Sequence, residues 1–196
     1  MHSHAQQVLD FWFLPRDDPG HGQPRAHWFR KDEGIDAEIR DRFGALIDSA
    51  LIGGVDHWLS SPIEPLPALA RILVLDQFTR NAFRGGARAF AGDALALQSA
   101  RALVASGADR SLSGVQRQFA YLPFEHAEDL AHQRTAVQLF QQLAIDEPAH
   151  TDLVTWAQRH LDVIARFGRF PHRNAALGRP STDDERSFLQ GPGSSF

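Results

Sequence analysis

The sequence contains no cysteine, and this absence excludes several kinds of chemistry. A chain of 196 residues without a thiol forms no disulfide, no thiolate nucleophile and no cysteine-ligated metal site. Methionine and tyrosine each occur once, whereas there are 14 phenylalanines and 4 tryptophans. We therefore expect a core that is built on large, rigid aromatic side chains.

Long apolar runs and an N-terminal signal are also missing. The best candidate for a membrane span, Leu66 to Leu75, is short and contains Arg71, so we predict no contact with a membrane. The first residues show no basic segment followed by an apolar one, which predicts a cytoplasmic protein without a secretory signal. A pI near 6.2 and a formal net charge of −4 argue against a nucleic-acid partner.

The composition is that of one globular domain. Hydrophobic residues make up 43% of the chain and charged residues 22%. A chain of this length buries roughly 70% of the surface that it exposes when unfolded. We predict a single helical domain over residues 1–196, with a flexible tail at 191–196 that is rich in glycine and serine.

Apolar residues recur at helical spacing along most of the chain. Between Ile35 and Leu51 they stand three and four residues apart, and Gly53-Gly54 follows as a stop. The same pattern predicts further helices at 8–14, 68–83, 90–104, 115–126, 130–143 and 151–167. A capping box, Thr182-Asp183-Asp184-Glu185, opens a last short helix, and no run alternates as a strand would. The sequence predicts an all-α, single-domain array of antiparallel helical hairpins with seven or eight helices.

Three polar segments interrupt this apolar pattern. In the first, Arg166, Arg169, Arg173 and Arg179 surround His172, and no acidic residue lies between Asp162 and Asp183. The others are residues 76–81 and residues 125–129. Loops that are fixed on a rigid scaffold often carry the residues that contact ligands. We expect the three segments to converge on one polar site.

The segment after residue 75 places Asp76, Arg80, Asn81 and Arg84 within one arc of a helix. One interpretation is structural: Asp76 pairs with Arg80, and Arg84 holds the loop that follows. In the other, Arg80, Asn81 and Arg84 donate to an anionic ligand, because guanidinium groups match carboxylate and phosphate oxygens. The sequence leaves both interpretations open.

The segment 125–129 combines three carboxylates with an imidazole. Repulsion among the carboxylates would raise the pKa of at least one of them, which suits a general acid or base. Alternatively, Glu128 and Asp129 only open the next helix, where acidic residues complement the helix dipole. That alternative leaves Glu125 and His126 unexplained. His160 shares a helix face with apolar residues, and we expect it in the core.

No motif supports a metal or a cofactor. The chain has no HExxH pattern, no Gly-x-Ser-x-Gly elbow, no GxGxxG sequence and no P-loop. A metal site would have to combine His126 and His172 with a carboxylate from separated segments. We predict neither metal nor cofactor.

Several of these motifs together resemble a bacterial family known as domain of unknown function 924. The matching segments are VLDFWF (8–13), WF (28–29), LDQFTRNAFRG (75–85), YLPFEHAEDL (121–130) and IARFGRFPHRN (164–174). The resemblance implies a tetratricopeptide-like, all-helical fold and implies no activity. Thr79 stands where the family usually has Pro, and Ala127 where it usually has Ser. The second change removes a possible helix cap or site hydroxyl, which argues against serine-dependent chemistry there.

The predicted function is to bind a small anionic ligand or an acidic peptide end. The expected binding residues are Asp76, Arg80, Asn81, Arg84, Glu128, Asp129, Arg169, Arg173 and Asn174. An alternative is an enzyme in which Glu125, His126 and His172 act as acid and base. A third is a protein-interaction scaffold, in which the same residues only hold the fold together. The oligomeric state stays open.

Overall fold

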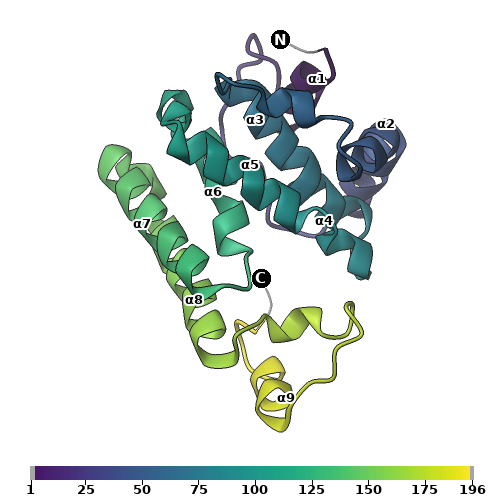
Figure 1. Ribbon diagram of the computed structural model, residues 1–196, viewed down its shortest axis with the longest axis vertical. Helices are drawn as coiled ribbons and strands as arrows, with labels where there is room; N and C mark the ends of the chain where they lie inside the picture. The colour runs from purple at the N-terminus through teal and green to yellow at the C-terminus, as the bar shows by residue number, and fades with distance from the viewer. Residues whose placement is uncertain (1–2, 195–196) are drawn as a thin grey trace. The chain divides into compact units, whose positions relative to one another are not determined.

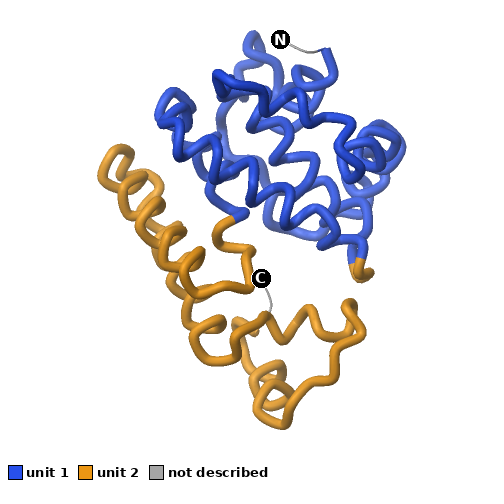
Figure 2. Tube along the Cα trace, viewed as in Figure 1, with its two compact units in different colours: residues 1–84, 88–123 blue, residues 85–87, 124–196 orange. Residues whose placement is uncertain are grey.

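A computed structural model describes residues 3–194, and within this range every element is helical (Figure 1). By their contacts, residues 1–84 and 88–123 form one compact unit, and residues 85–87 and 124–196 form another (Figure 2). We call them unit 1 and unit 2. The predicted single domain over residues 1–196 stays a prediction. Of the predicted tail, residues 191–194 follow the last helix and residues 195–196 lie outside the described range.

Helices account for most of unit 1. Those described are α1 (Ser3–Phe13), α2 (Glu33–Leu51), α3 (Pro65–Ile72), α4 (Thr79–Ala82), α5 (Asp93–Ala105) and α6 (Gly114–Glu125). Helix α3 packs against α1 and α5, while α2 packs against α4 (Figure 1). Helix α6 begins in unit 1, and its last two residues belong to unit 2.

The hydrogen-bond pattern changes from α-helical to π-helical within one continuous helical rod of unit 1. Helices α3 and α4 are joined without a break by a π-helical segment, Leu73–Phe78, in which all six residues are buried. Counted as one rod, these segments bring the number of α-helices in the described residues to eight. The predicted all-α class and number of helices are confirmed, whereas the π-helical winding was not predicted.

The end of the π segment is held by side chains. Thr79 Oγ1 donates to the carbonyl oxygens of Leu75 and Asp76, at 2.8 and 3.2 Å. Arg80 Nη1 also donates to the carbonyl oxygen of Asp76, at 2.9 Å. These bonds satisfy backbone acceptors in a fully buried stretch. Gly92 packs against the same place: a Cβ there would lie 2.0 Å from the carbonyl oxygen of Leu75.

Arg71, the charge that interrupts the longest apolar run, lies inside unit 1 with only 1% of its surface exposed. Its Nη2 contacts a carboxylate oxygen of Asp56 at 2.7 Å, and its Nη1 donates to the carbonyl oxygen of Leu95 at 3.0 Å and to the Ser99 hydroxyl. A buried guanidinium is tolerated when such partners accompany it. Arg71 therefore links α3 to α5 and to the 3-10 turn Asp56–Leu59.

The core of unit 1 is aromatic, as predicted. The Trp12 ring lies 6.1 Å from Trp28, 5.6 Å from Phe78 and 5.5 Å from Phe119, measured between ring centroids. Trp12, Phe78 and Phe119 are fully buried. Stacked, tilted and edge-on contacts of this kind add to the hydrophobic gain of burying large rings.

Unit 2 is built on a helical hairpin. Helices α7 (Leu130–Asp146) and α8 (Thr151–Phe167) run antiparallel and are joined by the 3-10 turn Pro148–His150 (Figure 1). Gly168, at φ 69°, ends α8 in the left-handed conformation, and its N–H donates to Ile164. A 3-10 turn, Pro171–Arg173, follows.

The C-terminal helix starts at the predicted capping box. Helix α9 spans Asp183–Leu189, and both hydrogen bonds of the box between Thr182 and Glu185 are present. Phe188 of α9 packs with Phe167 against a small core around Val163, Ile164 and Phe170. None of the helices described between residues 3 and 194 has the length and apolarity that a membrane crossing requires.

We expect Phe119→Ala to lower the free energy of unfolding by about 3–5 kcal/mol, because it leaves a cavity beside Trp12 and Trp28. Urea unfolding followed by circular dichroism measures this loss. Ile52→Ala is the control, since Ile52 is 87% exposed and its truncation changes stability by less than about 0.5 kcal/mol. Equal losses in the two variants would contradict an aromatic core.

Candidate functional site

The predicted binding residues of unit 1 lie at the end of the π segment. Arg80 makes a two-bond contact with Asp93, at 2.8 and 3.1 Å, and lies 2.9 Å from a carboxylate oxygen of Asp76. The Asp76 side chain is 1% exposed and also accepts from the amide of Gln77 at 2.6 Å. Burial lowers the pKa of Arg80, but the two carboxylates outweigh it and raise the pKa above its ordinary value. This guanidinium binds carboxylates of its own chain.

Arg84 is held in the same way, one turn further on. Its Nε and Nη2 contact the carboxylate of Asp36 at 2.8 and 2.9 Å, and these bonds raise the pKa of Arg84. Asn81 is buried on the same rod. The geometry in unit 1 therefore favours the structural interpretation of this segment, in which the arginines tie α4 to α2 and α5.

Unit 1 also has a groove that the sequence did not indicate. About 480 Å³ in volume, it opens between α1, α2 and the turn that follows Gly54. Phe43 and Trp58 form apolar parts of its wall, and Arg42, which pairs with Glu38 at 2.6 Å, contributes a cation. None of the residues predicted to bind a ligand lines this groove.

In unit 2, Glu128 holds the arginine-rich loop. Its carboxylate accepts two bonds from Arg179, at 2.6 and 2.9 Å, and a third from the backbone N–H of Phe170 at 2.7 Å. Arg179 also donates to the carbonyl oxygen of Phe170 at 3.2 Å. Burial raises the pKa of Glu128, but the bonds from Arg179 and Phe170 lower it more, so that it stays below its ordinary value.

The same network continues to α9. Arg179 donates to the Asn174 side chain at 3.0 Å, and the Asn174 amide reaches Glu185 at 3.3 Å. Glu185 accepts two bonds from Arg169, at 2.7 and 2.8 Å, and one from the backbone N–H of Thr182. The bonds from Arg169 and Thr182 lower the pKa of Glu185 to about 2.

This chain of bonds, which we call the loop network, comprises Glu128, Arg169, Asn174, Arg179 and Glu185. It fixes the segment between α8 and α9 at both ends. Three of its members were predicted as ligand-binding residues, and the structure gives them partners within the protein. The importance of Arg179 and Glu185 was missed. The signal was available, since a run of arginines without acidic neighbours needs carboxylates from elsewhere in the chain.

A second group of polar residues lies around His160 and Phe170. His160 Nδ1 lies 3.0 Å from a carboxylate oxygen of Glu125, and both side chains are almost fully buried. The His126 ring lies 6.5 Å from the His160 ring, measured between centroids. The ring of Phe170 is 5.6 Å from that of His160.

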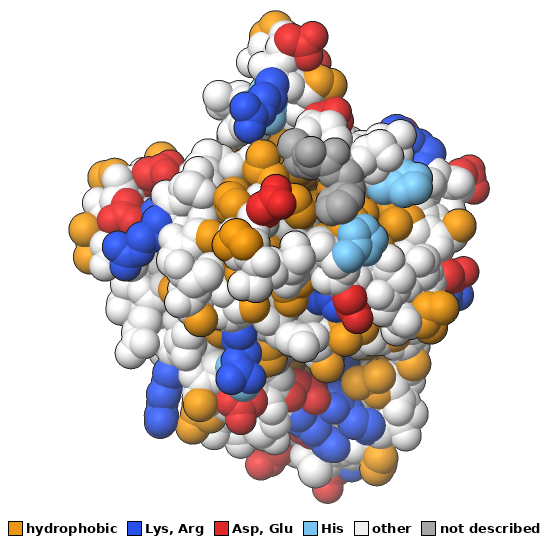
Figure 3. Space-filling model, turned by 45° about the horizontal axis from the view of Figure 1, so that its top comes forward, with side chains coloured by type: hydrophobic (Ala, Val, Ile, Leu, Met, Phe, Trp, Pro, Cys, Tyr) orange, Lys and Arg blue, Asp and Glu red, His pale blue; other side chains and the backbone are white. Residues whose placement is uncertain are grey.

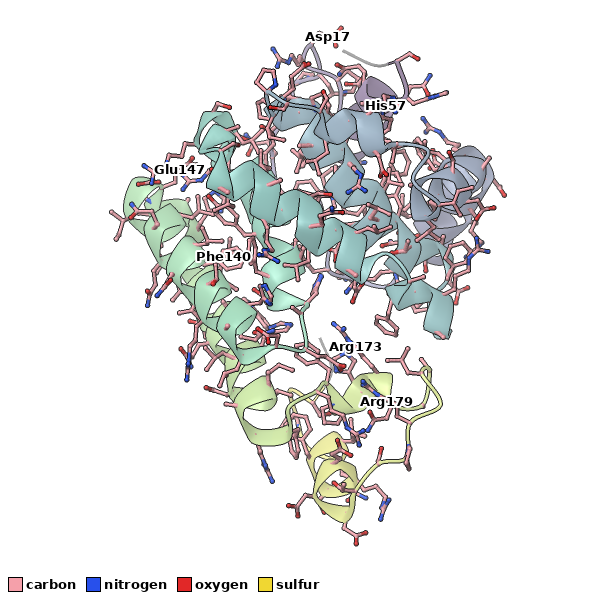
Figure 4. The ribbon with its side chains drawn as sticks, in the orientation of Figure 1. Asp17, His57, Phe140, Glu147, Arg173 and Arg179 are labelled. Atoms are coloured by element: carbon pink, nitrogen blue, oxygen red, sulfur yellow. The ribbon has the colours of Figure 1, made fainter. Side chains whose placement is uncertain are left out.

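The 3-10 turn after α8 completes this group. His172 has its ring 5.6 Å from that of Phe170, and the guanidinium carbon of Arg173 lies 4.5 Å from the centre of the Phe170 ring. Arg173 is 6% exposed. We call Glu125, His126, His160, His172 and Arg173 the imidazole cluster (Figure 4 labels Arg173 and, on the same segment, Arg179). All three candidate catalytic residues belong to it.

His160 was predicted as a core residue, and it is buried. The sequence did not indicate its contact with Glu125. The pKa of His160 is lowered to about 3: burial is the largest cause, the carbonyl of Trp156 opposes it, and the charges of His126, Arg173 and His172 contribute to the lowering. The imidazole of His160 is therefore neutral at pH 7.

Asp129 follows the simpler of its two interpretations. It is the N-cap of α7, where its side chain accepts from the backbone N–H of His132 at 2.9 Å, and this bond lowers its pKa.

Arg80 and Arg84 belong to unit 1, whereas Arg169 and Arg173 belong to unit 2. Convergence of all three polar segments stays a prediction.

In the range 3–194, no three or more His, Asp or Glu side chains are grouped so that they could hold a metal ion. On the face shown in Figure 3, basic and acidic side chains are interspersed. A continuous basic stripe, which is typical of nucleic-acid-binding surfaces, is not seen on that face.

The fold and these clusters define an all-helical protein with buried networks of polar side chains. A family model described as bacterial protein of unknown function (DUF924) matches residues 8–193, and the chain belongs to this family. A solved structure of a protein of unknown function from Agrobacterium tumefaciens is similar, with 39% sequence identity and a TM-score of 0.80. The match covers 95% of this chain and 97% of that one. No curated protein matches.

The low pKa of Glu185 predicts acid sensitivity. An Asp or Glu with a lowered pKa stabilises the fold above the pKa of the unfolded chain, here 4.5, and this contribution is lost as the pH falls towards about 2. Glu185→Gln should therefore unfold more easily at pH 7 and show a flatter loss of stability between pH 4.5 and pH 2. Asp184→Asn, an exposed neighbour in the same helical turn, is the control. Parallel pH profiles of wild type and Glu185→Gln would contradict the role given to Glu185.

Proposed function

We propose that unit 2 binds a small oxyanion, a carboxylate or a phosphate group, through Arg173, His126 and His172. The observation that carries the proposal is the gathering of a buried guanidinium and the rings of His160 and His172 around Phe170, with the His126 ring beside that of His160. Arginine forks and imidazole N–H groups are the usual donors to such oxygens. Of the arginines that were predicted to bind a ligand, Arg173 is the one that belongs to the imidazole cluster, and the proposal depends on it.

The electrostatics of the imidazole cluster support this choice. Arg173, His126 and His172 each lower the pKa of His160, so these three groups act on the ring as positive charges. Arg173 also helps to lower the pKa of Glu128. A buried positive region of this kind attracts an anion more strongly than the same charges do at the surface, because water screens them less.

The loop network supports the proposal through rigidity. His172 and Arg173 stand on a short turn between α8 and α9, and Glu128 and Glu185 hold that segment on both sides. A donor that is fixed before the ligand arrives loses little conformational entropy on binding. Arg169 and Arg179 therefore act in positioning the turn.

An acid–base enzyme is the second candidate, and the contact between Glu125 and His160 is the observation that favours it. A carboxylate that orients an imidazole is a recurrent feature of catalytic sites. In such an enzyme His126 or His172, which are partly exposed, exchange protons with the substrate. Arg173 would stabilise its negative charge.

The proposal predicts that sulfate or phosphate raises the melting temperature of the wild type, compared with sodium chloride at equal ionic strength. An anion at about 100 times its Kd stabilises the folded state by about 2.7 kcal/mol. Arg173→Gln should lose this protection. Arg166→Gln removes an exposed arginine at the end of α8 and should keep it.

The opposite result is equally clear. If Arg173 only holds the fold together, Arg173→Gln costs about 3–5 kcal/mol of stability and the wild type is indifferent to both anions. That pair of results would end the proposal.

A further inference from the structure

The groove of unit 1 is large enough to hold a small molecule. Its volume is about 480 Å³, and every residue that lines it belongs to unit 1. Small-molecule sites in proteins commonly have volumes of about 300–1,000 Å³. No residue of the imidazole cluster lines the groove, so a site here is independent of the one proposed for unit 2.

Part of the groove wall is apolar and rigid. Phe43 and Trp58 contribute aromatic rings, and Leu46 and Val55 contribute aliphatic side chains. Phe43, Val55 and Trp58 are at most 4% exposed, so packing in the core fixes them. A wall of this kind stabilises the apolar part of a ligand, because that part leaves water without requiring the protein to rearrange.

The charges around the groove favour a negatively charged ligand. Its described lining includes Arg42 and two histidines but neither aspartate nor glutamate, although the chain has 24 acidic residues against 20 basic ones. Asp48 and Asp56, which adjoin lining residues in the sequence, bind Arg88 and Arg71. The groove therefore complements an anion.

Arg42 is held in position before a ligand arrives. Its Nη1 lies 2.6 Å from a carboxylate oxygen of Glu38, and its guanidinium carbon lies 4.9 and 5.2 Å from the ring centres of Phe11 and Phe43. These contacts restrict the side chain, so binding costs little conformational entropy. An exposed i,i+4 ion pair is weak, and a guanidinium has five N–H donors. A second carboxylate can therefore bind Arg42 beside Glu38 or in its place.

We infer that the groove between α1, α2 and the turn Asp56–Leu59 binds a small monocarboxylate with an apolar body. The carboxylate binds Arg42, and the body packs against Phe43 and Trp58. The imidazole of His57, which is labelled in Figure 4 and stands on that turn, lines the same groove. The ligand class comprises aromatic and aliphatic acids, and it goes beyond the small oxyanion proposed for unit 2.

Nuclear magnetic resonance of the full chain, titrated with 3-phenylpropionate and separately with octanoate, tests the inference. Either acid should shift the indole N–H signal of Trp58 and leave that of Trp156, a residue of unit 2, unchanged. The uncharged 3-phenylpropanamide should bind about tenfold more weakly than 3-phenylpropionate, because hydrogen bonds to a charged group are the stronger ones.

Two variants of α2 locate the ligand. Arg42→Gln should abolish the difference between the acid and its amide, whereas Arg101→Gln, at an exposed position of α5 outside the groove, should keep it. Ala45→Phe adds a ring at an exposed position of the groove lining and should weaken both acids at least about tenfold. Its control is Ala105→Phe, at the exposed end of α5.

Each contrary result overturns a defined part of the inference. Equal affinity of the acid and the amide for the wild type overturns recognition of the carboxylate, and it does so even if a variant fails to fold. No shift of the Trp58 signal with either acid at about 10 mM overturns the site itself. Binding that survives Ala45→Phe overturns its location in the groove. None of these results touches the oxyanion site of unit 2, which sulfate and Arg173→Gln test separately.

Discussion

The contact between Glu128 and Arg179 is the interaction on which the C-terminal part of the structure depends. The Glu128 carboxylate accepts two bonds from the Arg179 guanidinium and a third from the backbone N–H of Phe170. It therefore fixes both the Arg179 side chain and the main chain at Phe170. The ring of Phe170 in turn packs against the rings of His160 and His172 and against the guanidinium of Arg173. Without Glu128, Arg179 would lose its carboxylate partner and the backbone N–H of Phe170 would lose its acceptor, so the cluster would lose part of its support.

Much of the fold could be predicted because it follows from local rules. Helix α8 and its end at Gly168 follow from a 3.6-residue period and from the freedom of glycine to adopt a positive φ. The π segment could not be predicted. Every residue from Leu73 to Phe78 is buried, so the sequence shows no alternation of apolar and exposed polar residues from which a π-helix could be told from an α-helix. The side-chain bonds from Thr79 and Arg80 that accompany it become visible only in three dimensions.

The candidate site, like the fold, could be predicted only in part from the sequence. The sequence predicts that Arg80 and Arg84 need partners, but it does not show that Asp93 and Asp36 supply them, because the second pair is separated by 48 residues. It likewise predicts a buried His160 and an unexplained Glu125 without indicating that they meet. Periodicity tells which side chains turn inward. Which inward side chains touch is decided by the packing of helices that are distant in the chain.

The distance along the chain between Glu128 and Arg179 has a consequence for biosynthesis. Their contact spans 51 residues, and Glu185 is needed to secure Arg169 as well. The residues of α7 and α8 are synthesised before Arg179 and Glu185, so the hairpin precedes the side chains that fix the turn. A chain released after residue 178 would contain the hairpin and Arg173 but neither Arg179 nor Glu185, and it would lack both contacts that hold the turn in place.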